Sequence, residues 1–127
     1  DPKLISYALE ALGSIADPTS LPKLKSFLKD RPKMAPQILS SIGLIPGEEA
    51  RLVLEESAKS GDADVHRPAL EEISKRRDPK SIPLLLEFIN GDSAEKRKMA
   101  YYALAEITGE KFRTAKEWND WAKVNVR

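Results

Sequence analysis

The sequence predicts an all-α fold, a right-handed α-solenoid (an α-α superhelix) of four helical hairpins. One observation is a repeated phrase, because Asp17-Pro18 returns 61 positions later as Asp78-Pro79. A second is a set of paired apolar residues at steps of 30, 31 and 34 residues, a period typical of stacked repeat units. A third is the three- and four-residue spacing of apolar side chains inside each step, which indicates helices rather than strands. The pairs are Leu9/Leu12, Leu39/Ile42, Leu70/Ile73 and Leu104/Ile107.

The repeated phrase fits the turn between the two helices of a hairpin. After each Asp-Pro, the same kinds of residue follow at the same distances: Ser, then Leu or Ile, then Pro. Aspartate is favoured as the cap of a helix N-terminus, and proline is favoured at the first helical position, where a missing N–H costs nothing. The sequence therefore predicts that one helix begins at Pro18 and another at Pro79. Asp1-Pro2 is predicted to be a third example of this turn.

The repeat predicts a single domain made of four units, each an A helix followed by a B helix. The domain covers 1–127, and its units cover about 1–30, 31–61, 62–91 and 92–127. Gly47, Gly61 and Gly91 fall between apolar stretches, where breaks between helices belong. Pro36 and Pro68 are predicted to lie in the first turns of A helices, because first-turn N–H groups have no partner within the helix.

Composition narrows the classes of function. Lys and Arg total 21 and Asp and Glu total 20, so net charge gives no reason to expect nucleic acid or an anionic membrane as a partner. The absence of cysteine rules out disulfides and thiolate metal ligands. No apolar run approaches the ~20 residues that a membrane-spanning helix needs. Because the repeat is in phase at Asp1, we expect either a monomer or part of a longer repeat chain.

The first unit carries a recognisable family pattern. Its sequence YALEALGSIADPTSLPKLKSFLKD, residues 7–30, contains an Ala-Leu-x-x-Leu-Gly run, an Asp-Pro turn and a Pro-x-Leu helix start. This pattern resembles the short HEAT repeat of the phycobilisome-lyase type. The third unit keeps the Asp-Pro turn but has Ser74 in place of the glycine, and the second keeps Ile42-Gly43 but lacks Asp-Pro.

The resemblance implies a function as well as a fold. Repeats of this type serve mainly as protein-binding scaffolds, so the chain is expected to be a non-enzymatic scaffold or adaptor that binds another protein or peptide and needs no cofactor. The B helices of such repeats line the concave side. The inward positions are then expected at Lys25, Lys29, Glu55, Lys59, Leu86 and Asn90. The alternative is a bilin-lyase-like subunit or chaperone, and a HEAT-like nucleic-acid binder or glycosylase is disfavoured by the charge pattern.

No residue cluster predicts catalysis or metal binding. His66 lies close to Asp62 and Asp64, but a single histidine among acids is more often a polar residue of a helix's first turn. The stretch that begins at Asp62 departs from a calcium-binding loop, because Arg67 replaces the required glycine and Ile73 replaces the final glutamate. We therefore assign no catalytic residue and no metal ligand.

The charged clusters are expected to lie on solvated helix faces. Glu55 and Lys59 have the i,i+4 spacing of a helical ion pair. The basic runs 75–77 and 96–98 are expected at the C-terminal end of one A helix and the N-terminal end of the next, so they do not form one patch.

The last unit is expected to close the repeat. Residues 107–123 are similar to the C-terminal cap of many bacterial HEAT-repeat proteins, although Arg113 stands where that cap commonly has glycine. Phe112, Trp118 and Trp121 are predicted to be the large apolar side chains that this cap buries.

Overall fold

The computed structural model describes residue 3 and residues 17–126. The chain divides into two compact units, Asp1–Glu72 and Ile73–Arg127, with the boundary inside α5 (Ala63–Arg76). Within the described residues all regular structure is helical, which confirms the all-α prediction. The A helix predicted for the first hairpin, with Leu9, Leu12 and Asp1-Pro2, lies outside the described residues. The prediction of a single domain stays a prediction.

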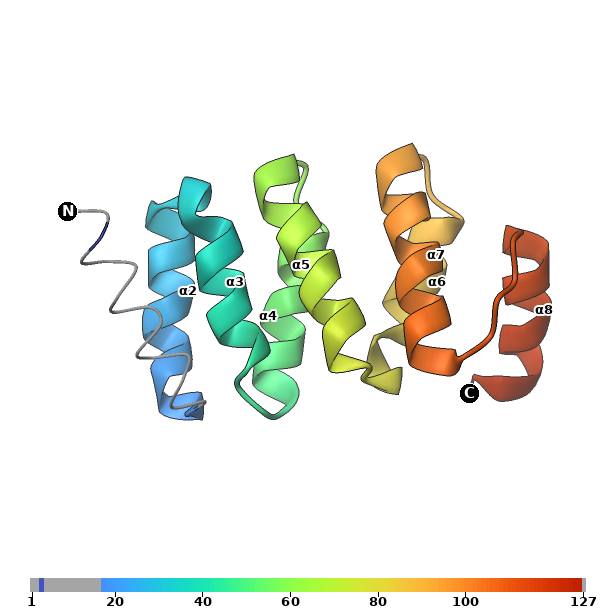
Figure 1. Ribbon diagram of the computed structural model, residues 1–127, viewed down its shortest axis with the longest axis horizontal. Helices are drawn as coiled ribbons and strands as arrows, with labels where there is room; N and C mark the ends of the chain where they lie inside the picture. Colours follow the sequence, from blue (N-terminus) through green and yellow to red (C-terminus); the bar gives the residue numbers. More distant parts are fainter. Residues whose placement is uncertain (1–2, 4–16, 127) are drawn as a thin grey trace. The chain divides into compact units, whose positions relative to one another are not determined.

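The first unit is built around α3. A 3₁₀ turn, η1 (Pro18–Ser20), leads into α2 (Leu21–Asp30), and a second, η2 (Pro32–Met34), leads into α3 (Ala35–Gly43) and then α4 (Glu48–Ala58). Helix α3 packs against both α2 and α4, and Figure 1 shows it between them. These helices bury an apolar core because each keeps its aliphatic side chains on one side. The core includes Leu24, Ile38, Leu39, Ile42, Ile45 and Leu54.

The second unit is built around α6. It begins with the C-terminal part of α5 and the turn η3 (Pro79–Ser81), followed by α6 (Ile82–Ile89), α7 (Ala94–Thr108) and α8 (Ala115–Asn125). Helix α6 packs against α7, which lies in front of it in Figure 1, and also against α8. The order of helices from α3 to α8 agrees with alternating A and B helices, and their division into repeat units stays a prediction. The core includes Ile73, Leu84, Leu85, Ala103, Leu104 and Trp118.

The two Asp-Pro phrases adopt the same backbone geometry. Asp17 has φ −99° and ψ 123°, and its carboxylate accepts a hydrogen bond from the N–H of Thr19 at 2.9 Å. Asp78 has φ −85° and ψ 116°, and its carboxylate accepts from the N–H of Lys80 at 3.0 Å. Each phrase caps a 3₁₀ turn that continues into an α-helix. The repeated phrase is therefore a repeated helix start, as predicted.

The placement of Pro68 differs from the prediction. Pro36 is in the first turn of α3, as expected, but α5 begins at Ala63 and holds Pro68 in its interior. The helix starts early because the Asp62 carboxylate accepts from the N–H of Asp64 at 2.9 Å, the side-chain cap that favours a helix N-terminus. Pro68 lacks the N–H that would bond four residues back, so this turn of α5 has one backbone hydrogen bond fewer.

Gly43, the glycine of the Ile42-Gly43 pair, lies where a side chain from α5 comes close to α3. A Cβ added at Gly43 would overlap the carboxylate of Glu72, which is buried against the end of α3. Both residues belong to the first unit. Glycine at this position allows the close approach of the side chain from α5.

Candidate functional site

An open groove lies between α2 and α4 in the first unit. It has two adjoining parts of about 400 Å³ and about 550 Å³, which share Pro22, Lys25, Val53 and Glu56. Other lining residues include Leu21, Ser26, Lys29, Glu49 and Leu52. Both walls are B helices of their hairpins. The groove therefore lies on the surface where the sequence predicts binding.

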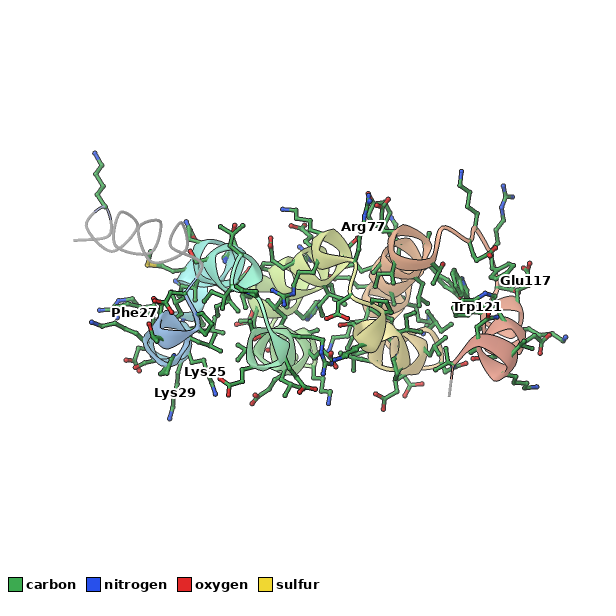
Figure 2. The ribbon with its side chains drawn as sticks, turned by 90° about the horizontal axis from the view of Figure 1, so that it is seen from below. Lys25, Phe27, Lys29, Arg77, Glu117 and Trp121 are labelled. Atoms are coloured by element: carbon green, nitrogen blue, oxygen red, sulfur yellow. The ribbon has the colours of Figure 1, made fainter. Side chains whose placement is uncertain are left out.

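The two walls of the groove carry opposite charges. Lys25 and Lys29 belong to α2, and Figure 2 shows both projecting on the side away from α3. Glu49 and Glu56 belong to α4. None of these four side chains forms an ion pair with any residue that the structure describes. All four are exposed, so their charges are available to a molecule that enters the groove.

The apolar lining of one part of the groove includes Leu21, Leu52 and Val53, of which Leu52 is the most exposed. Its neighbours Val53 and Leu54 are buried, at 7% and 0% exposed, whereas Leu52 is 50% exposed. Fully burying a leucine side chain is worth about 1.5–3 kcal/mol, so covering the exposed half of Leu52 is worth about 1 kcal/mol. A half-exposed leucine alone is common, but this one belongs to the α4 wall and lines the groove together with Lys25 of α2.

The structure separates the predicted binding residues of the first unit. Lys25 and Lys29 line the groove, whereas Glu55 does not. The Glu55 side chain is 15% exposed and accepts a hydrogen bond from Arg51 one turn earlier. Lys59, at the C-terminal end of α4, is exposed. Successive helical residues differ by about 100°, so the side of α4 that faces α2 is the one carrying Glu49, Leu52 and Glu56.

Of the two predicted binding residues of the second unit, one is half-buried and the other is hydrogen-bonded within the chain. Leu86 is half-buried on α6. Asn90 exchanges two side-chain hydrogen bonds of 3.0 Å with Asn119, which lies on α8. A partner at Asn90 would compete with these bonds, so the groove beside α2 offers the more accessible surface.

A buried cation sits on the side of α4 away from this groove. Arg51 is 8% exposed, donates to Glu48 at 2.9 Å and also donates to Glu55. Its Nε has no hydrogen-bond partner among the described residues. Burial opposes the charged form, but the hydrogen bonds and charges of Glu55 and Glu48 outweigh it and raise the pKa of Arg51 above its ordinary value. Two of the acids of α4 therefore hold Arg51 in place instead of facing a partner.

His66 has a structural position near the start of α5. The side chain is 6% exposed, and its Nδ1 lies 3.0 Å from the carbonyl oxygen of Ser60. Because a carbonyl oxygen only accepts, the ring donates through Nδ1 and ties the helix to the preceding turn. Among residue 3 and residues 17–126, no group of three or more His, Cys, Asp or Glu side chains is placed to hold a metal ion.

Side chains of both basic runs, 75–77 and 96–98, contact other residues of the second unit. Arg77 donates to Glu106 near the end of α7 at 2.8 Å. At the start of α7, Lys96 lies over the ring of Phe88 at 5.4 Å, and Arg97 donates to the Gly91 carbonyl at 2.8 Å. The two runs therefore lie toward opposite ends of α7, as predicted, and do not merge into one basic track. No helix in the described part of the chain is long and apolar enough to span a membrane.

The aromatic residues of the last unit form a cluster. Trp118 is 0% exposed and meets Phe112 and Trp121 edge-on, with ring centroids 5.0 Å and 5.6 Å away. In Figure 2, Trp121 lies on the inner side of α8. This cluster buries apolar surface between α8 and the rest of its unit, as expected for a closing helix. That it is a bacterial-type cap stays a prediction.

Comparison with known protein families agrees with this architecture. Residues 5–30 match the family model of the PBS lyase HEAT-like repeat. No curated protein and no solved structure gives a significant match to the chain. The matched stretch ends with α2, and hairpins of the same helical type follow it at a period of about 30 residues. This match, together with the repeated capped turn, supports a HEAT-like repeat protein.

Proposed function

We propose that this chain is a non-enzymatic interaction scaffold or adaptor, and that it binds another protein through the groove between α2 and α4. HEAT-like repeats are typically scaffolds rather than catalysts. The observation that carries the proposal is the exposure of Leu52 in a groove whose α2 wall carries Lys25 and Lys29 and whose α4 wall carries Glu49 and Glu56. Interfaces draw most of their binding energy from a few central side chains, and Leu52 offers apolar surface that a partner can bury.

The alternative function is that of a bilin-lyase-like subunit or chaperone. It is supported by the name of the matching family model. Mixing the protein with a bilin and its acceptor protein distinguishes this alternative, because a chromophore that is bound or transferred changes its absorbance.

A pair of matched substitutions tests the proposed groove. Leu52→Glu places a charge on the apolar part of the groove, so it is expected to lower capture of the partner from a lysate by at least about tenfold. Tyr102→Glu changes another exposed large apolar residue, 65% exposed on α7, and is expected to leave capture unchanged. Both variants should keep the wild-type melting temperature within a few degrees, since neither site is core. Equal capture by wild type and Leu52→Glu would rule out the groove as the binding site.

A further inference from the structure

The walls of the groove restrict the conformation of anything that binds in it. Both walls are α-helices, whose backbone N–H and C=O groups are paired within the helix over most of its length. An extended peptide would find no strand edge to bond to, so its backbone groups would gain no hydrogen bonds from the walls. A helix satisfies its backbone internally. The groove is therefore suited to a helical segment rather than to a strand.

The charges on the two walls determine which charged side chains a bound helix must carry on its edges. The helices α2 and α4 have 10 and 11 residues, so the groove is about 15 Å long, or roughly three helical turns. A helix lying along it would present one edge to Lys25 and Lys29 and the opposite edge to Glu49 and Glu56. An edge with the same charge as its wall would be repelled, and an edge of opposite charge would form ion pairs.

We propose that the groove binds an amphipathic α-helix of the partner, with a leucine-like apolar face, acidic residues along one edge and basic residues along the other. This inference rests on the proposed function and adds the chemistry of the partner. The acidic edge lies against α2 and the basic edge against α4. For a given helix this pairing is satisfied in one N-to-C direction, so the two walls also set the orientation of the bound segment.

Three stapled peptides of about 14 residues test the chemistry, since stapling makes so short a helix form before binding. All three carry the same apolar face. One has Glu on one edge and Lys on the other, the second has Glu on both edges, and the third has Lys on both. Fluorescence anisotropy at low salt is expected to show that the mixed peptide binds at least about tenfold tighter than either of the others. High salt should reduce this difference. Equal affinity for the three peptides would overturn the inference.

Inverting one wall gives the sharper test. The double variant Glu49→Lys, Glu56→Lys makes both walls basic, so it is expected to prefer the all-Glu peptide by about tenfold. A control variant, Glu71→Lys, Glu110→Lys, changes the net charge equally at exposed sites outside the groove and is expected to keep the wild-type preference. A shift of similar size in the control would contradict the assignment to the groove.

Two further outcomes separate this inference from the proposed function. If Leu52→Glu loses the captured partner while the peptides show no preference, the groove binds a partner but the helix chemistry is wrong. If sedimentation shows a dimer that Leu52→Glu dissociates and the mixed peptide does not, a second copy of the chain occupies the groove and the inference fails.

Discussion

Replacing Ile73 by Asp is expected to lower the free energy of unfolding by more than about 4 kcal/mol, enough to abolish cooperative folding of its unit. Ile73 lies on α5 and is 1% exposed. An isolated carboxylate there would lose its hydration without gaining a hydrogen-bond or ion-pair partner. The loss is measured by thermal or urea unfolding followed by circular dichroism, with Ile73→Val expected to cost about 1 kcal/mol.

The control for this prediction is Val124→Asp in the same unit. Val124 is 84% exposed, so the same type of substitution is expected to change stability by about 0.5 kcal/mol or less. If Ile73→Asp melted within a degree or two of wild type, the repeat register that places Leu70 and Ile73 in the core would be contradicted.

Removing the side chain of Trp118 is expected to be the second largest effect, at about 3–5 kcal/mol for Trp118→Ala. The indole is fully buried and contacts two other rings edge-on, so truncation leaves a large cavity and removes both aromatic contacts. Its Nε1 has no hydrogen-bond partner among the described residues, so no hydrogen bond is lost. Unfolding in urea measures the change, and the exposed apolar surface should also bind a hydrophobic dye.

Trp121→Ala is the matched control for Trp118→Ala. Trp121 is only half-buried and has one of the two ring contacts, so its loss is expected to cost roughly half as much. Similar costs for the two variants would mean that Trp118 is not the side chain that anchors α8.

Much of the fold could be predicted because it depends on local chemistry. The Asp-Pro turns follow from aspartate as a cap and proline at a helix start, and the structure gives Asp17 and Asp78 nearly the same dihedral angles. The apolar pairs follow from helical periodicity, and Leu70, Ile73 and Leu104 are buried. The prediction for Pro68 was wrong because the cap at Asp62 starts α5 at Ala63, well before the proline.

The groove was harder to predict because it is formed by two helices from different repeats. Equivalent positions in successive units, such as Lys25 and Glu55, do not line the same groove. The α2 wall includes Lys25 and Lys29, whereas the α4 wall includes Glu49, Leu52 and Glu56 and not Glu55. The sequence did hold one signal, since Leu52 is an apolar residue next to the buried stripe of its helix. Glu55 has basic residues at i,i+4 spacing on both sides, Arg51 and Lys59, and periodicity alone does not specify its ion pair with Arg51.

Site-specific photo-crosslinking tests the central claim, that the α2–α4 groove contacts a partner protein, most directly. A benzophenone amino acid replaces Ser26, which is exposed and lines the groove, or Tyr102 on α7. In a lysate of the source organism, irradiation is expected to give one discrete adduct from position 26, absent when Leu52→Glu is added, and none from position 102. An adduct of the same mass from position 102 alone, or one from position 26 that survives Leu52→Glu, would contradict the groove as the binding surface.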